Sequence, residues 1–466
     1  MKFAVRREAI TPAQPVFMHG FGSRDHKSEG VMEPLYMTAA LLQANREFLI
    51  VTIDALGADR SFVVGIKDEL KQAFGLEHAE VLINFSHTHH SVFLTGLDLR
   101  LRRGGYSMSQ AGWPFDESEL DYTEDEAYYR HIRDLLLSMV KDCYDHLTEG
   151  GLQVARGTSD FGCSRRRPDG AGGVLWMPYY EGEIDTDLFV LKLTDTAGQL
   201  HGILYCYGCH TTAIGADNYL LGNDFAGPAS AMLERTYPGA TAIFLQGCAG
   251  ELKPRPGADG DAFISCSSEN IREVGEMLAR DIVTVMEGGS FKKVQCQFKA
   301  ELCDPLLYTE KLPASFYQAI ARDPESDSFH KAAATRTLKG IEDGTVKDRI
   351  PLYIAVWQFD EETSLVAIEG EVSTEYALKL KQLFGHAHGK GGGTASGGDL
   401  IVLGYTNGVF GYVPTRKMLQ EGGYEAECNY YWSLSGPFVP EIEDIIIGQI
   451  AQAFGRLSGR IPVPAT

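Results

Sequence analysis

Three stretches of the chain repeat one pattern, in which an apolar strand is followed by an amphipathic helix and then by a second strand. In the first, residues 48–54 (FLIVTID) have the composition of a strand, residues 63–74 carry apolar side chains on one helical face, and residues 80–85 (EVLINF) read as the next strand. Gly75 is expected to end the helix. A strand–helix–strand unit favours parallel pairing of its strands, so the sequence predicts an α/β fold.

The second stretch adds a hairpin to this pattern. Residues 188–210 read as two strands that turn around residues 196–198, and the second strand delivers His210. A helix over about 225–235 and a strand over 240–246 follow. Because hairpin strands are antiparallel, the sheets are expected to be mixed, with helices flanking them.

The third stretch repeats the order of the second. A hairpin over residues 354–371 delivers Glu371 and is followed by a helix over 374–384 and a strand over 400–403. The loop expected after that strand holds Tyr405, Asn407 and Tyr412. Each of the three stretches therefore brings polar side chains to the carboxyl end of a strand, where sites form in open α/β sheets.

Histidines gather at the end of the first stretch, in Ser86-His87-Thr88-His89-His90. On an extended chain His87 and His89 point to the same side, which suits a divalent metal ion or a ligand with a hydrogen-bond donor. The alternative is a group of loop histidines with local hydrogen bonds. The metallo-β-lactamase pattern HxHxDH fails because Ser-Val follows, and the predicted hairpins disfavour a TIM-barrel amidohydrolase.

His210 and Glu371 occupy the same kind of position as His87. Two histidines, a carboxylate and an open position make an ordinary catalytic zinc site. The alternatives are a structural histidine and a carboxylate that stabilises the start of the next helix. Cys206–His210 also spells the haem-attachment motif CxxCH, but its place on a predicted strand and the lack of an export signal disfavour haem or a redox role.

The charge of the chain limits its partners. A net charge of −21 repels phosphate backbones and anionic lipid headgroups, so neither nucleic acid nor a membrane surface is an expected partner. No apolar run is long enough for a transmembrane segment, and the N-terminus has no signal-peptide core, so a cytoplasmic location is expected. Nine scattered cysteines, an odd number, predict reduced thiols rather than a disulfide scaffold.

Two segments read as loops. The glycine-rich residues 389–398 lack the spacing of a phosphate-binding loop and predict a flexible surface loop. Residues 105–126 are aromatic, acidic and aperiodic, which predicts a long irregular loop near a pocket or, as the alternative, an ordinary surface excursion.

Seven short motifs occur in one order: Ile10–Pro12, Gly20–Arg24, Ser86–His89, Gly208–His210, Gly247–Pro254, Glu369–Glu371 and Gly411–Thr415. In this order they resemble the N-terminal catalytic domain of the neutral/alkaline non-lysosomal ceramidases, from about residue 4 to about residue 440. The resemblance implies a ceramidase-like α/β catalytic domain. We expect residues 1–466 to form this one domain, without the C-terminal β-sandwich or the secretion signal of the family.

The resemblance also implies a set of site residues. The family holds one zinc ion with two histidines, a glutamate and a tyrosine, which by motif carry over to His87, His210, Glu371 and Tyr412. His89 would face the substrate beside the metal. Arg165 resembles the arginine of a substrate-contact motif, with Arg166 as the alternative register.

One departure from the family bears on the substrate. Where the ceramidases read Gly-Asp-x-Ser-Pro, this chain reads Gly-Glu-Leu-Lys-Pro, so Lys253 replaces a serine that contacts substrate. An ammonium group there suits a carboxylate or phosphate on the substrate, and the alternative is a solvated loop lysine.

The sequence thus predicts a hydrolase with one zinc ion that cleaves an N-acyl amide. The expected substrate is a small acyl-amide or lipid-like molecule, soluble rather than membrane-presented ceramide. Catalysis would involve His89, Tyr412, Arg165 and Lys253. The alternative from another class is a metal-binding protein of the same fold without turnover.

Overall fold

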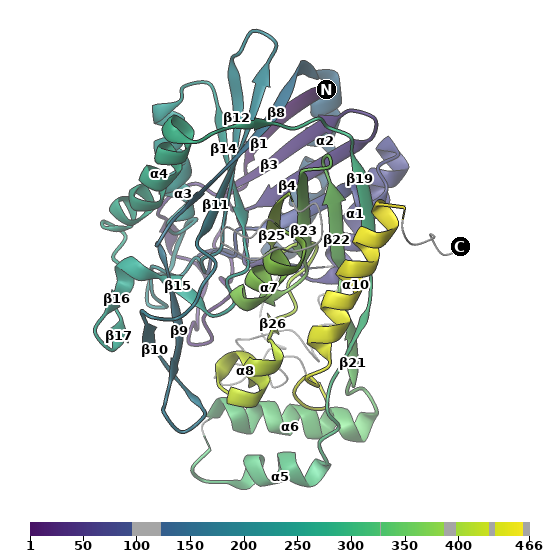
Figure 1. Ribbon diagram of the computed structural model, residues 1–466. Helices are drawn as coiled ribbons and strands as arrows, with labels where there is room; N and C mark the ends of the chain where they lie inside the picture. Colours follow the sequence, from purple (N-terminus) through teal and green to yellow (C-terminus); the bar gives the residue numbers. More distant parts are fainter. Residues whose placement is uncertain (96–122, 327, 386–397, 428–433, 460–466) are drawn as a thin grey trace.

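The computed structural model describes residues 1–95, 123–326, 328–385, 398–427 and 434–459, and its largest element is a nine-stranded mixed sheet (Figure 1). In order across the sheet the strands are β14 (Thr241–Gln246), β12 (Leu200–Tyr207), β11 (Asp187–Asp195), β8 (Thr148–Thr158), β1 (Lys2–Ala9), β3 (Tyr36–Gln43), β4 (Glu47–Ile53) and β6 (Val81–Phe85), with β18 (Lys292–Lys293) paired to β8. The β4–β6 and β12–β14 pairs are parallel, as the strand–helix–strand patterns predict, and the β11–β12 hairpin is antiparallel.

A second sheet of four strands packs face to face against the first. Its order is β19 (Lys299–Cys303), β22 (Ile354–Gln358), β23 (Thr363–Ile368) and β25 (Asp399–Leu403), with β23 and β25 parallel. The ring of Phe48 on β4 stacks between Phe298 and Trp357, at centroid distances of 4.5 and 3.9 Å. Because successive strand residues point to opposite faces and both faces are covered, these strands are continuously apolar.

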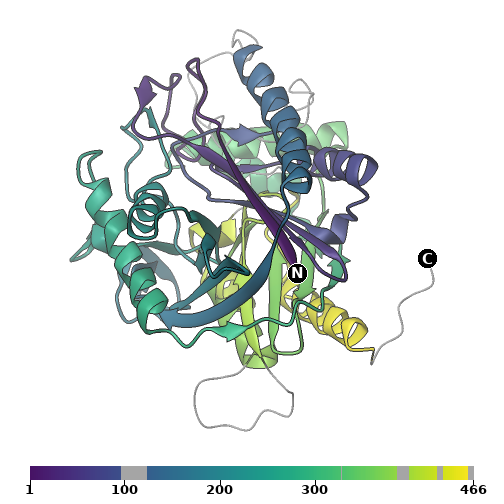
Figure 2. The ribbon, with the colours of Figure 1, turned by 90° about the horizontal axis from the view of Figure 1, so that it is seen from above.

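Helices cover the outer face of each sheet, which gives four layers (Figures 1 and 2). The large sheet carries α1 (Arg60–Phe74), α2 (Thr123–Asp145), α3 (Ala226–Thr236) and α4 (Ile271–Gly288), and the small sheet carries α7 (Thr374–Phe384) and α10 (Ile442–Leu457). Helix α1 begins where the Asp59 side chain accepts a hydrogen bond from the Phe62 amide and ends at Gly75, whose φ of 78° is left-handed.

Shorter elements complete the fold. At the bottom of Figure 1, α5 (Ala314–Arg322) and α6 (Ser328–Asp343) form a separate helical pair. The short strand pairings are β10 (Val174–Tyr179) with β9 (Gly162–Pro168) and β15 (Leu252–Pro254), β24 (Glu371–Val372) with β26 (Tyr412–Val413), β16 (Ala258–Asp259) with β17 (Ala262–Phe263), β20 (Leu306–Tyr308) with β21 (Arg349–Pro351), β13 (Leu220–Leu221) with β2 (Gly30–Val31), and β5 (Gly57–Ala58) with β7 (Phe93–Leu94). One further helix is α8 (Arg416–Glu421), and the short 3₁₀ turns are η1 (His78–Glu80), η4 (Arg255–Gly257) and η5 (Tyr424–Glu427).

Two loop predictions need correction. Tyr412 lies on β26 rather than in a loop, because β26 pairs in parallel with β24 and so places Tyr412 opposite Glu371. Residues 123–126, predicted as part of an irregular loop, form the acidic first turn of α2, where carboxylates favour the helix start. The rest of that segment and all but the last residue of the glycine-rich stretch 389–398 lie outside the described residues.

Asn84 joins the two sheets at the ends of three strands. Its buried side-chain amide donates to the backbone oxygens of Gln246 and Gly404 at 3.2 and 3.0 Å and to Oγ1 of Thr406 at 2.9 Å. Its Oδ1 accepts from the Gln246 amide at 2.8 Å. A fully bonded buried amide fixes its neighbours in one arrangement, so Asn84 sets how the ends of β6, β14 and β25 meet.

In the part of the chain that the structure describes, no helix combines the length and the apolar character of a membrane-spanning segment.

Candidate metal centre

Three buried histidines converge beyond the strand ends. His87 follows β6, His89 lies two residues further on, and His210 follows β12. The Nε2 atoms of His87 and His210 are 3.1 Å apart, and those of His210 and His89 are 3.2 Å apart. The fold therefore brings side chains 123 residues apart in the sequence into one cluster that could hold a metal ion.

The orientation of two of these rings is set by backbone carbonyls. His87 donates from Nδ1 to the oxygen of Leu56 at 2.6 Å, and His210 donates from Nδ1 to the oxygen of Ala249 at 3.2 Å. A carbonyl can only accept, so each Nδ1 carries the proton and each Nε2 presents a lone pair. The two Nε2 atoms that face each other are therefore both acceptors.

Glu371 brings a third acceptor to the same point. Its Oε2 lies 3.3 Å from Nε2 of His87 and 3.6 Å from Nε2 of His210. Among the described residues no hydrogen-bond donor reaches this buried oxygen. Leaving three buried acceptors without a proton between them is costly, so the arrangement calls for a cation.

The spacing of the three atoms fits a small divalent ion. Ligand atoms about 2.0–2.1 Å from a tetrahedral zinc ion lie roughly 3.3–3.4 Å from one another. The three observed separations of 3.1, 3.3 and 3.6 Å bracket that value. Nitrogen and carboxylate oxygen are also the donor atoms that zinc takes, so these residues fit the ion that the sequence predicts.

Burial keeps the histidines in their metal-binding form. It is the main cause that lowers the pKa of His89 and of His210 well below the usual histidine value, and neighbouring groups such as His87 and Lys253 lower both pKa values further. Both rings are neutral at pH 7, which is the state in which imidazole binds a metal.

His89 is held by the loop that contains Gly20 and Arg24. A Cβ atom at Gly20, where φ is +105°, would lie 2.4 Å from Nδ1 of His89, so only glycine allows the ring this position. Arg24 donates to the backbone oxygens of His89 and Asn218. Nδ1 of His89 is buried on the side of Gly20, so the ring turns its other nitrogen, Nε2, toward Nε2 of His210. The geometry thus allows His89 to be a further ligand or to face the substrate.

Two tyrosines border the cluster. Tyr412 lies opposite Glu371 across the β24–β26 pair, and its hydroxyl accepts a hydrogen bond from Nη2 of Arg165 at 3.1 Å. Burial raises the pKa of the Tyr412 hydroxyl well above its usual value. The Tyr405 hydroxyl lies 3.3 Å from Nδ1 of His210, and its ring centroid lies 4.4 Å from that of His87. Tyr405 therefore supports both predicted histidine ligands.

A second group of charged side chains lies beside the histidines. It comprises Arg165, Arg166 and Glu425, and we call it the arginine cluster. Arg165 donates from Nε to one oxygen of Glu425 at 2.7 Å, and Arg166 donates from Nη1 to the other at 2.6 Å. Burial opposes ionisation, but the two guanidinium groups hold the pKa of Glu425 below its usual range. Nη2 of Arg165 also donates to the Gly250 oxygen at 2.9 Å, so this arginine positions Tyr412 and the loop around Gly250.

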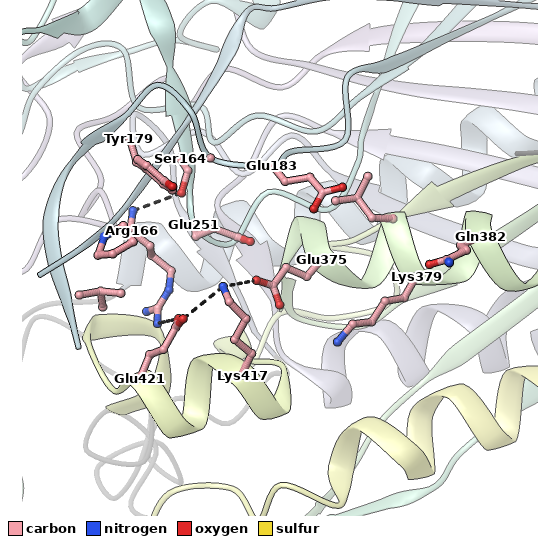
Figure 3. Close-up of a pocket in the computed structure, with 14 residues that line it drawn as sticks. Ser164, Arg166, Tyr179, Glu183, Glu251, Glu375, Lys379, Gln382, Lys417 and Glu421 are labelled. Atoms are coloured by element: carbon pink, nitrogen blue, oxygen red, sulfur yellow. Dashed lines mark hydrogen bonds and ion pairs between the residues drawn. The ribbon is translucent and has the colours of Figure 1, made fainter. Parts of the chain in front are cut away.

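Arg166, the alternative register, lines a polar cavity of about 350 Å³ (Figure 3). Lys417 forms ion pairs with Glu375 at 3.0 Å and Glu421 at 3.3 Å across this cavity. Glu251 lines it too, and accepts hydrogen bonds from Ser373 Oγ at 2.6 Å and the amide that begins α7 at 3.1 Å. The three histidines do not line this cavity, so it is separate from the metal centre.

Lys253, on β15, is half-buried and lies near the histidines. Its Nζ donates to the backbone oxygen of Thr212 at 3.0 Å and to Thr212 Oγ1 at 3.1 Å. Burial is the main cause that lowers its pKa to about 8, and the nearby charge of Arg165 adds to it. The lysine is therefore not the solvated loop residue that the sequence left as an alternative.

Sequence reasoning missed two members of this region. Glu425 lies 260 residues from Arg165 and carries no local motif, so only the tertiary structure identifies it. The sequence predicts Tyr405 in the loop after the strand at 400–403, but no sequence pattern indicates its contact with His210.

Comparison with known proteins gives a family match and several similar solved structures. The family model "Neutral/alkaline non-lysosomal ceramidase, N-terminal" matches residues 5–304. The neutral ceramidase of Pseudomonas aeruginosa superposes with a TM-score of 0.72 at 19% identity, over 100% of this chain and 75% of that one. A structure described as ceramidase complexed with C2 gives 0.70 at 18% identity, over 100% and 76%. At such identities the likeness shows a shared fold, and no curated protein matches.

Proposed function

We propose that this chain, which belongs to the neutral/alkaline non-lysosomal ceramidase family, is a zinc-dependent hydrolase that cleaves a soluble N-acyl amide. Membership of a ceramidase family implies an amide hydrolase. The proposal of zinc rests on the convergence of Nε2 of His87, Nε2 of His210 and Oε2 of Glu371, the last of which has no hydrogen-bond donor among the described residues. We also propose that residues 1–466 act as one catalytic domain.

The protein supplies the ligands in a fixed orientation. The carbonyls of Leu56 and Ala249 hold the Nδ1 protons of His87 and His210, which keeps both Nε2 lone pairs available. Zinc bound by these atoms and Glu371 would supply Lewis-acid polarisation of the amide carbonyl and would make water acidic enough to react at neutral pH. Tyr412 is the fourth proposed ligand, next to Glu371 across the β24–β26 pair.

Charge that develops on the amide oxygen would be stabilised by Tyr412 and His89. Because Arg165 donates to the oxygen of Tyr412, the tyrosine keeps its own proton free to donate to the substrate. His89 turns its Nε2 toward the proposed metal, 3.2 Å from Nε2 of His210. A well-placed donor of this kind contributes about 3–4 kcal/mol to transition-state stabilisation.

Lys253 supports an anionic substrate. Its side chain is half-buried, and among the described residues no carboxylate lies within ion-pairing distance of it. A half-buried cation without such a partner favours an anionic ligand. We therefore propose that the substrate carries a carboxylate or phosphate and is soluble, in contrast to ceramide presented by a membrane.

A second candidate function is a metal-binding protein of this fold without turnover. The replacement of the family serine by Lys253 favours it, because that serine contacts substrate in the relatives that the sequence resembles.

Metal analysis and hydrolysis assays distinguish the two functions. The purified protein should contain one zinc ion per chain and should release amine from N-acyl amino acids, and chelation should stop the reaction until zinc is restored. Stoichiometric zinc with no cleavage of any N-acyl amide in a broad panel would support the binding protein. Hydrolysis that survives complete metal removal would contradict the proposed mechanism.

A further inference from the structure

Two aromatic rings flank the Lys253 ammonium. Its Nζ lies 5.8 Å from the ring centroid of Trp176 on β10 and 5.7 Å from that of Phe263 on β17. The two rings meet edge to face at 5.6 Å. Both distances are within cation–π range, so the ammonium and the rings form one unit. We call Lys253, Trp176 and Phe263 the lysine–aromatic unit.

One of the two rings is open to the surface. Trp176 is 51% exposed, and its edge-to-face contact with Phe263 joins the two rings into one apolar surface. An exposed tryptophan ring beside a cation offers a contact for an apolar ligand group that also carries a negative charge.

The same unit adjoins the metal centre. The ammonium donates to the backbone oxygen and hydroxyl of Thr212, and the Thr212 amide closes a turn by donating to the oxygen of His210 at 2.8 Å. Through Thr212, the ammonium is thus connected to the proposed ligand His210 by two successive hydrogen bonds.

One ammonium hydrogen remains for a ligand. A lysine has three N–H donors, and Thr212 accepts two of them. Within the described ranges no Asp or Glu pairs with Lys253, so a carboxylate on a bound molecule would complete its hydrogen bonds.

We infer that the lysine–aromatic unit binds the amine half of the substrate, and that this half is an apolar α-amino acid. The inference rests on the proposed amide hydrolysis and names its substrate class. In an N-acyl amino acid, the carboxylate and the side chain are attached to the same carbon next to the amide nitrogen. A carboxylate on Lys253 would consequently place that side chain against Trp176 and Phe263, with the amide directed toward the histidines.

The binding test uses 3-phenylpropanoate, which has the carboxylate and the apolar group but no amide to cleave. Calorimetry on the zinc-loaded protein should show at least tenfold weaker binding of this probe to Trp176→Ala, with binding of propanoate unchanged. Lys253→Met should lower its affinity to that of neutral 3-phenylpropanamide. Because carboxylates also bind metal ions, the comparison between variants decides the result.

Leu383→Ala is the matched control, since Leu383 is 53% exposed and lies on α7, outside the lysine–aromatic unit. It should bind the probe like the parent protein. Equal binding of 3-phenylpropanoate by the parent and Trp176→Ala would overturn the subsite. If the variants respond as expected but no N-acyl amino acid is hydrolysed, the subsite stands and the proposed function fails. If N-acylphenylalanine and N-acylglycine are hydrolysed equally well, the subsite fails and the proposed function stands.

Discussion

Two buried groups of ionisable side chains lie next to each other and differ in how many of their acceptors receive a donor. One is the arginine cluster, and the other is the histidine cluster, which comprises His87, His89, His210 and Glu371. In the arginine cluster both oxygens of Glu425 receive guanidinium donors. In the histidine cluster the Nε2 lone pairs of His87 and His210 face Oε2 of Glu371, and no described residue donates to that oxygen. The first network is complete within the protein, whereas the second becomes complete only with a bound cation.

The largest expected effect comes from breaking the complete network. Glu425→Gln would leave two buried guanidinium groups without their carboxylate and should lower the free energy of unfolding by about 3–5 kcal/mol. Urea denaturation measures this change. Glu421→Gln is the control, because Glu421 pairs with Arg166 at 3.3 Å at the partly exposed edge of the cluster and should cost less than about 1 kcal/mol. Equal stability of Glu425→Gln and the parent would contradict the matched network.

Breaking the incomplete network should remove the metal and leave the fold intact. His87→Ala deletes a proposed ligand, and the large scaffold around the site should stay folded. Zinc affinity should fall more than about 100-fold, because residues that only support the ligands already change it about 10–100-fold. Elemental analysis and chelator competition measure zinc content and affinity. His26→Ala, which changes an exposed histidine, should retain full zinc. Stoichiometric zinc in His87→Ala would show that His87 is not a ligand.

A smaller effect is expected from Asn84, which touches neither cluster. Asn84→Ala removes the bonds that join the ends of β6, β14 and β25, so zinc affinity should fall about 10–100-fold. Asn45→Ala is the matched control, because Asn45 also joins the two sheets through backbone bonds, to Phe298 at 2.9 and 2.7 Å. Asn45→Ala should lower stability without changing zinc affinity. If the two variants bind zinc equally well, Asn84 serves stability alone.

The contrast between the clusters also explains what the sequence could predict. The strands that end near His87 and His210, and helices such as 374–384, follow from local apolar periodicity, and the structure contains them within one or two residues. The arginine cluster and the contacts of Asn84 depend on partners 162 to 322 residues away, which leave no local pattern. The sequence predicts a loop at Tyr412, because a strand of two residues is too short to show an alternating pattern.

The smallest expected effect concerns the charge beside the histidines. Burial lowers the pKa of Lys253 from 10.5 to about 8, so the group is an ammonium below pH 8 and a neutral amine above it. The preference for an anionic N-acyl amino acid over its neutral amide should therefore be constant below about pH 7. Above pH 8 it should fall about tenfold per pH unit, and each tenfold step corresponds to about 1.4 kcal/mol of lost discrimination. The ratio of the two kcat/KM values between pH 6 and 9.5 measures this preference and cancels ionisations that affect both substrates alike. Lys253→Ser should lower the ratio by about 1–3 kcal/mol at pH 7 and remove its pH dependence. A pH-dependent ratio that persists in Lys253→Ser would assign the recognition of the anion to another group.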